Sequence, residues 1–148
     1  WHLGDHLVWG KHTIFERSLN STFLIKAPGK TKGSSVNKVV SSIDIYPTLM
    51  ELCEVKMPHQ TNGKSLVPLL SNPLQSWEDI SFGYFKDGIS LRTERYRLTK
   101  YFRDQEPAIE LYDHQTDPNE TKNIAAENQG IVEQLLQVWE KGNTGLYD

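Results

Sequence analysis

Apolar and polar residues alternate through much of the second half of the chain, a pattern typical of strands that have two different faces. Four such runs span residues 80–85, 89–92, 96–101 and 109–112, and the breaks between them hold charged residues, glycine or proline. Connections this short join only antiparallel neighbours. The pattern therefore predicts a small antiparallel sheet over residues 80–112.

A helical period follows the predicted strands. Between residues 128 and 141 the apolar residues fall on one stripe and the polar residues lie opposite, with the stripe made of Ile131, Leu135, Val138 and Trp139. A helix with one apolar face buries that face against another element. We therefore expect an amphipathic helix packed across one face of the sheet, which gives this half of the chain an α+β fold.

The first half has weaker patterns. Residues 13–19 predict a short helix with Thr13 as N-cap and Glu16 completing a capping box. Residues 23–27 predict a short strand that ends at a Pro-Gly pair, and residues 41–54 predict a helix from their apolar spacing. The remainder of this half is rich in loop-forming residues.

Composition bounds the class of protein. Of the 148 residues, 37% are hydrophobic and 24% are charged, which favours a packed core over disorder. A formal net charge of -3 gives no reason to expect nucleic acid or an anionic membrane as a partner. No apolar run approaches the roughly 20 residues that span a bilayer. Cys53 is the only cysteine, and its apolar surroundings predict a buried core thiol.

The chain opens on Trp1 rather than methionine, and its first six residues have the composition of a loop interior. We therefore expect a longer protein to extend upstream of Trp1.

Four segments, in their order and spacing, carry a resemblance to a known family. They are Gly10-Lys11-His12-Thr13-Ile14-Phe15-Glu16; Ser42-Ile43-Asp44-Ile45-Tyr46-Pro47 with Asn62-Gly63-Lys64-Ser65-Leu66; Leu91-Arg92-Thr93-Glu94-Arg95-Tyr96-Arg97-Leu98; and Glu110-Leu111-Tyr112-Asp113 with Asp117-Pro118-Asn119-Glu120-Thr121-Lys122-Asn123. Together they resemble the sulfatase family of the alkaline-phosphatase-like superfamily, over most of the chain. The opening Trp1-His2-Leu3-Gly4-Asp5-His6 is most similar to the iduronate-2-sulfatase branch.

This resemblance implies an α/β fold of which the chain holds only the end. Residues 1–75 would be the C-terminal end of the large catalytic domain, and residues 76–148 a small antiparallel-sheet subdomain with its terminal helix. The nucleophile implied by the family is a formylglycine made from an upstream Cys or Ser, beside a calcium ion. Both would lie upstream of Trp1, so we expect no metal ligand in this chain and no activity from the chain alone.

The resemblance also implies three site residues. Lys11 matches a lysine that contacts the sulfate, where an ammonium acts as a point charge on a sulfuryl oxygen. Trp1 and His6 would line the substrate pocket. The plainer alternatives are a solvated lysine, an ordered loop histidine and an exposed tryptophan.

Two further questions stay open in the sequence. Arg92, Arg95 and Arg97 form a basic run that is expected on a solvated face, with a grip on anionic sugar as the less favoured alternative. The function implied is hydrolysis of sulfate esters, with sulfated saccharides such as iduronate 2-sulfate as substrates. The alternatives are a phosphate or phosphonate ester hydrolase of the same superfamily, and a non-catalytic binding module. Relatives work in the periplasm, outside the cell or in lysosomes, and the sequence does not choose among these compartments.

Overall fold

The computed structural model describes residues 1–29 and 33–142, which form two compact units. The sheet unit joins residues 1–21 to the chain from Ile80 onward, and the helical unit spans Thr22–Asp79. Residues 1–21 pack with the sheet in this structure. The boundary at residues 75/76, between the end of a larger catalytic domain and a small subdomain, stays a prediction.

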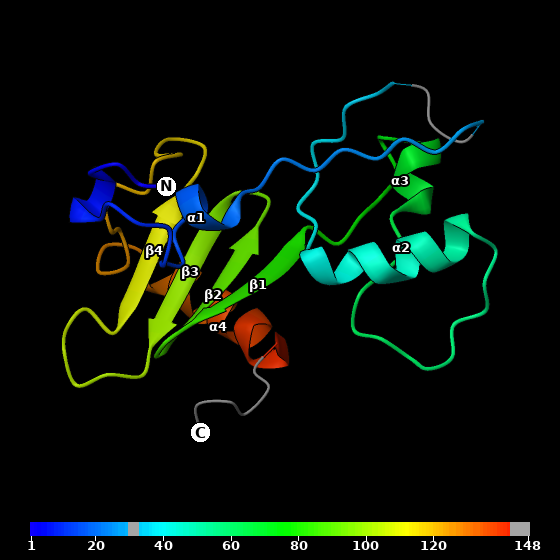
Figure 1. The fold of residues 1–148 in the computed structure, drawn as a ribbon. Helices are drawn as coiled ribbons and strands as arrows, with labels where there is room; N and C mark the ends of the chain where they lie inside the picture. Colours follow the sequence, from blue (N-terminus) through cyan, green and yellow to red (C-terminus); the bar gives the residue numbers. More distant parts are fainter. Residues whose placement is uncertain (30–32, 143–148) are drawn as a thin grey trace. The chain divides into compact units, whose positions relative to one another are not determined.

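The sheet unit contains the predicted antiparallel sheet. Its strands are β1 (Ile80–Phe85), β2 (Gly88–Thr93), β3 (Tyr96–Tyr101) and β4 (Ile109–Asp113), and they are hydrogen-bonded in chain order. Helix α4 (Gln129–Trp139) lies across one face and runs into the 3-10 turn η3 (Glu140–Gly142) (Figure 1). The predicted strands, their antiparallel order and the helix on one face are confirmed.

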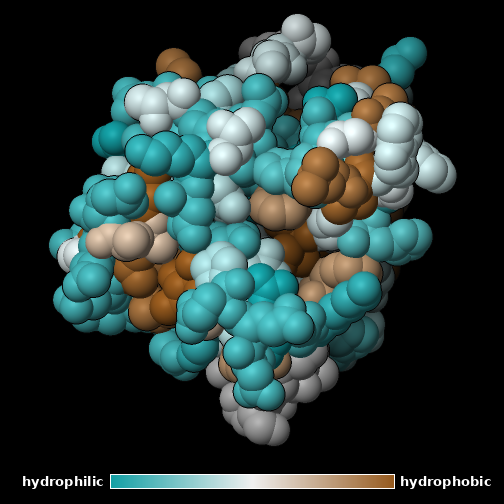
Figure 2. Space-filling model, turned by 90° about the vertical axis from the view of Figure 1, so that its left-hand side faces the viewer, coloured by the Kyte–Doolittle hydropathy of each residue, from teal (hydrophilic) through white to brown (hydrophobic). Residues whose placement is uncertain are grey.

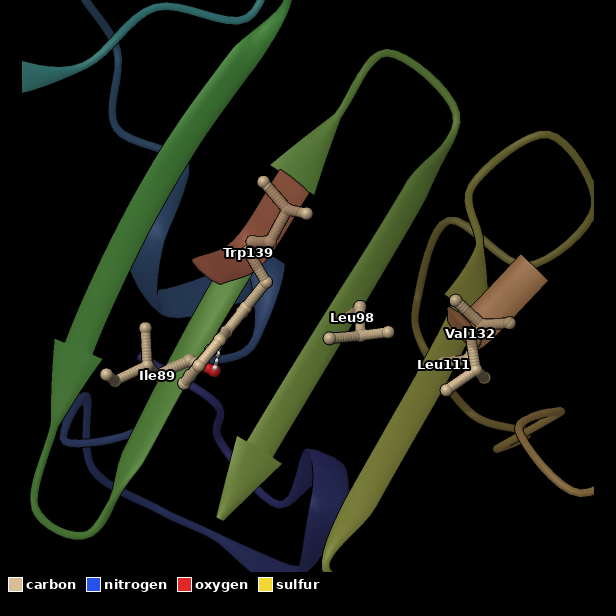
Figure 3. Close-up of a cluster of buried hydrophobic side chains, with 6 residues drawn as sticks. Ile89, Leu98, Leu111, Val132 and Trp139 are labelled. Carbon is tan, nitrogen blue, oxygen red and sulfur yellow. Dashed lines mark hydrogen bonds between the residues drawn. The ribbon is translucent and has the colours of Figure 1, made fainter. Parts of the chain in front are cut away.

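The face under α4 is the hydrophobic core. Register places Leu91 opposite Leu98, and Leu98 opposite Leu111, so the three side chains share this face. Val132 and Trp139 cover them from the helix (Figure 3). Trp139 is fully buried, and its indole Nε1 donates a hydrogen bond of 3.2 Å to the carbonyl of Ile89.

The opposite face of the sheet is polar, and it is also covered. Residues 1–19, which we call the strap, cross it and include the 3-10 turn η1 (Asp5–Leu7) and helix α1 (Glu16–Leu19). Four sheet side chains on this face are buried: Ser90, Arg97, Thr99 and Glu110. Arg97 is only 2% exposed, so the prediction that it lies on a solvated face is wrong.

Two local predictions in the first half are also wrong. Helix α1 begins at Glu16, with Phe15 as its N-cap, because the hydroxyl of Thr13 is engaged elsewhere, within 2.7 Å of His2 Nε2. Residues 23–27 form no strand, since no described segment pairs with them.

The helical unit contains the predicted helix, as the 3-10 turn η2 (Ser42–Asp44) followed by α2 (Ile45–Leu52), and a short α3 (Val67–Ser71). The Asp44 carboxylate accepts hydrogen bonds of 2.8 Å from the main-chain N–H groups of Ser41 and Lys64. Gly63 lies so close to this turn that a Cβ would stand 2.1 Å from the carbonyl oxygen of Ile43. The two parts of the second resemblance segment are therefore joined in space.

Cys53 follows the last residue of α2 and is exposed, so the predicted core thiol is wrong. Among the described residues, no helix is long and apolar enough to cross a membrane.

The core predicts a large cost for removing its central side chain. Trp139→Ala should lower the free energy of unfolding by about 3–5 kcal/mol, because it empties the space between α4 and the sheet. Urea denaturation measures the change. Gln137→Ala, on the exposed side of the same helix, is the matched control and should stay within about 0.5 kcal/mol of the parent. Equal costs for the two variants would contradict the packing.

Candidate functional site

The strap is fixed at its start by a buried histidine. His2 is fully buried, and its Nε2 lies 2.7 Å from the Thr13 hydroxyl and 2.8 Å from the Ser18 hydroxyl. Its main-chain N–H donates a hydrogen bond of 3.0 Å to the carbonyl of Gly10. Burial lowers the pKa of His2, and the nearby charge of His6 adds to this effect, so the imidazole is neutral at physiological pH. These contacts close residues 2–10 into a loop of defined shape.

Lys11 lies immediately after this closure. Its carbonyl accepts a hydrogen bond of 2.9 Å from the N–H of Thr13, so the backbone is held on both sides. Its side chain is exposed, and no residue in the described ranges pairs with the ammonium. The backbone is therefore ordered while the charge is left available to an external anion.

His6 lies within the loop and is ordered by two contacts. Its ring stacks on Phe15, with the centroids 4.0 Å apart, and its Nε2–H donates a hydrogen bond of 3.0 Å to the carbonyl of Asn119. The side chain of Trp1 is 74% exposed. Lys11, His6 and Trp1 thus share the strap, but no contact within the described chain joins their side chains. Their assignment to a sulfate and substrate site stays a prediction.

An ion-pair network lies beneath the strap. Arg97 donates from Nε to Glu120 at 2.5 Å and from a terminal nitrogen to Glu16, which also accepts a hydrogen bond of 3.2 Å from Arg92. The second oxygen of Glu120 accepts a hydrogen bond of 2.7 Å from the main-chain N–H of Glu16. His114 Nε2 lies 2.7 Å from the first oxygen. Strap, sheet and the loop after β4 therefore meet at one carboxylate.

Each buried charge in this network has a counter-charge or a hydrogen-bond donor beside it. Burial alone would raise the pKa of Glu120, but the hydrogen bond from His114 and the charge of Arg97 more than offset it. The pKa of Glu120 is therefore held below its ordinary value. Because the side chains of Arg97 and Glu120 are 2% and 1% exposed, each is the counter-charge that lets the other stay ionised away from water.

The same residues contain the one described group with the spacing of metal ligands, namely Glu16, His114 and Glu120. Calcium takes six to eight oxygen ligands, but this group offers a ring nitrogen and carboxylate oxygens already bonded to Arg92 and Arg97. The group does not fit the calcium ion that the resemblance implies.

Glu110 is a second buried carboxylate on this face, and its pKa is shifted in the opposite direction to that of Glu120. Glu110 accepts a hydrogen bond of 3.0 Å from the Tyr101 hydroxyl, and no described cation is bonded to it. Burial raises the pKa of Glu110, and the neighbouring hydroxyls of Tyr101 and Tyr112 offset this only in part. Burial and the negative charge of Glu110 also raise the pKa of both tyrosines.

Comparison with known proteins shows the family. Residues 4–142 match the family described as N-sulphoglucosamine sulphohydrolase, C-terminal. The chain belongs to this family. The part of the resemblance that names sulfatases is therefore confirmed.

Curated relatives of the chain are named as sulfatases. Arylsulfatase K of Gallus gallus is 29% identical over 147 residues, which cover 90% of this chain and 28% of that protein. N-acetylglucosamine-6-O-sulfatase of Bacteroides thetaiotaomicron is 26% identical over 154 residues, which cover 94% of this chain and 27% of that protein. The chain thus spans about a quarter of the length of these relatives.

Solved structures share the fold. A 2-O GAG sulfatase matches with a TM-score of 0.60 at 25% identity, over 74% of this chain and 26% of that one. A protein solved with its substrate D-glucosamine-2-N,6-O-disulfate matches with a TM-score of 0.59 at 25% identity, over 71% of this chain and 25% of that one.

The two buried carboxylates predict opposite pH dependences. Glu120 has a lowered folded pKa, so its contribution to stability is present above the ordinary glutamate pKa of about 4.3 and is lost as pH falls through the folded value. Glu110 has a raised folded pKa, so its contribution is present below that ordinary value and is lost as pH rises through the folded one.

Unfolding free energies of the parent, Glu120→Gln and Glu110→Gln, measured from about pH 3 to 8, test this pair. The cost of Glu120→Gln should grow with rising pH. Glu110→Gln should instead gain stability relative to the parent as pH rises, so each variant serves as the other's control. The same sign for both would contradict the electrostatic assignment.

Proposed function

We propose that the full-length protein hydrolyses sulfate esters of sulfated saccharides, and that this chain forms its C-terminal part. The observation that carries the proposal is the family match over residues 4–142. Relatives of which this chain covers about a quarter are named sulfatases. Of two similar solved structures, one is a 2-O GAG sulfatase and the other holds its substrate D-glucosamine-2-N,6-O-disulfate. The competing function, phosphate or phosphonate ester hydrolysis, has no such support among these proteins.

The proposal assigns the nucleophile and the metal to the protein upstream of Trp1. A formylglycine hydrate would supply the attacking oxygen, and calcium would supply positive charge beside it. Cys53 does not fit as the formylglycine precursor, because Val55 and Met57 stand where the Cys-x-Pro/Ala-x-Arg motif needs Pro or Ala and then Arg. The described group around Glu120 offers a ring nitrogen and carboxylates already paired with arginines, a set that calcium does not favour.

Lys11 is the proposed contribution of this chain to the reaction. During sulfate-ester cleavage, negative charge spreads over the sulfuryl oxygens, and a fixed cation aimed at them stabilises the transition state. The ordered backbone at Gly10 and Lys11, with an ammonium that no described residue neutralises, supports this role. Desolvation by substrate would strengthen the attraction further.

His6 and Trp1 are the proposed substrate contacts. An exposed indole offers an apolar face to a sugar ring. The ring of His6 is held by Phe15 and Asn119, so little conformational freedom is lost when substrate binds. Within sulfated saccharides we propose a 2-O-sulfated uronate such as iduronate 2-sulfate, on the likeness of residues 1–6 to that branch.

The first test is turnover by the full-length enzyme. We expect sulfate release from a 2-O-sulfated uronate saccharide, slower release from a 6-O-sulfated glucosamine, and none from an aryl phosphate. In the same enzyme, Lys11→Ala should lower kcat/KM by roughly 10²–10³, chiefly through kcat, because the contact strengthens as charge develops.

Two controls separate a catalytic lysine from a surface one. Lys122→Ala, an exposed lysine of the same unit, should leave both constants within about twofold. Lys11→Arg should restore activity only in part, because a planar fork does not reproduce a compact ammonium. Near-normal turnover by Lys11→Ala would refute the role of Lys11, and preferred turnover of the phosphate would refute the sulfatase proposal.

A further inference from the structure

We propose that Glu120 is a positioning residue: its carboxylate clamps the strap onto the sheet and thereby fixes Lys11 and His6 for substrate. The inference rests on the proposed function, since it takes these two residues as the groups that meet the sulfated sugar. It adds a residue more than 100 positions away in the sequence, one that does not itself touch the substrate.

The first step of the argument is the geometry of the carboxylate. One oxygen of Glu120 accepts from the sheet and the loop, through Arg97 at 2.5 Å and His114 at 2.7 Å. The other oxygen accepts from the strap, through the main-chain N–H of Glu16 at 2.7 Å. That N–H belongs to the first turn of α1, where the main-chain donors have no partner within the helix.

The second step is the link from the clamp to the site residues. Asn119, the neighbour of Glu120, accepts the hydrogen bond from His6, and Phe15, the neighbour of Glu16, stacks on the His6 ring. Both ends of the clamp therefore hold His6. From Glu16 the strap runs back through Thr13, whose N–H is bonded to the carbonyl of Lys11.

The third step is the backbone on both sides of the contact. Glu120 has φ 57° and His6 has φ 53°, values in the left-handed region that few residues other than glycine adopt. Such conformations are unfavourable and persist where the surroundings hold them. Leu3 and Leu7 of the strap have the same kind of backbone, with φ 53° and 57°. Both the strap and the loop that carries Glu120 therefore hold backbone conformations that depend on their surroundings.

The experiment uses the full-length enzyme with Glu120→Gln. The amide retains one acceptor oxygen, so it can serve either the Glu16 N–H or the cationic donors, while its NH₂ group faces donors on the other side. The strap should loosen. We expect kcat/KM to fall by about 10–100-fold, with most of the loss in kcat, as for a misplaced catalytic group.

A double-mutant cycle with Lys11→Ala distinguishes positioning from a general loss of stability. If Glu120 acts through the strap, Glu120→Gln should slow the Lys11→Ala enzyme by clearly less than it slows the parent, because the part of the loss that comes from Lys11 is already gone and only the part from His6 remains. Full multiplication of the two losses would overturn the proposal, as would a Glu120→Gln enzyme within twofold of the parent while Lys11→Ala is impaired.

Amide hydrogen exchange supplies a readout that does not depend on activity. Glu120→Gln should speed exchange in a peptide covering residues 1–19 by at least about tenfold and leave β2 and β3 unchanged. The matched control is Asp113→Asn, the same chemical change at a carboxylate that binds Arg95 and not the strap. It should change neither strap exchange nor kcat. If Lys11→Ala proves fully active, the role of Lys11 fails, and strap exchange alone still decides whether Glu120 is the clamp.

His114→Ala is the milder variant should Glu120→Gln fail to fold. It removes one hydrogen bond from the Glu120 carboxylate and leaves the Arg97 contact in place. Strap exchange and kcat should move in the same direction by a smaller factor, and unchanged strap exchange in this variant would overturn the clamp.

Discussion

The buried guanidinium of Arg97 is the constraint on which the sheet unit depends. An ion removed from water costs several kcal/mol unless counter-charges and hydrogen bonds replace its hydration. Arg97 finds its two counter-charges in Glu16, on the strap, and Glu120, on the loop after β4. Neither belongs to the sheet itself, so the sheet buries this arginine only when both other segments are in place. The strap is therefore a component of the fold rather than a tail lying on its surface.

This constraint explains why the sheet has two buried faces of different chemistry. One face is apolar and is closed by Trp139 and its neighbours on α4. The other carries Ser90, Arg97, Thr99 and Glu110, all of them buried, and of these Ser90, Arg97 and Glu110 are hydrogen-bonded or ion-paired through their side chains. The strap that closes it still leaves large apolar side chains exposed, including Trp1, Leu3, Leu7 and Trp9. On the side shown in Figure 2, apolar residues reach the surface in several areas set among hydrophilic ones.

The sequence patterns predicted the sheet and α4 well, because alternation and helical period are local and each element obeys its own period. They wrongly placed Arg97 on a solvated face, because a polar residue on an alternating strand is usually solvated. The strap residue that pairs with it, Glu16, lies 81 residues earlier in the chain. The prediction of Thr13 as N-cap was wrong for a related reason, because its hydroxyl is hydrogen-bonded to the ring of His2 and does not cap α1. The run at residues 23–27 has strand composition but no partner strand in the described chain. The one sequence signal that Glu16, Arg97 and Glu120 have in common is membership in three of the resemblance segments, which the structure joins in one network.

The central claim is that charges on the strap and the sheet stabilise each other through Arg97. A double-mutant cycle on the unfolding free energy, with Glu16→Gln and Arg97→Gln singly and together, measures that coupling at neutral pH. The account predicts a favourable coupling of about 1–3 kcal/mol, because Glu16→Gln removes a counter-charge only while the Arg97 guanidinium is present, whereas loss of Arg97 affects Glu120 equally in the single and the double variant. Additive effects, within about 0.5 kcal/mol, would show that the strap and the sheet are held together by something other than this ion pair.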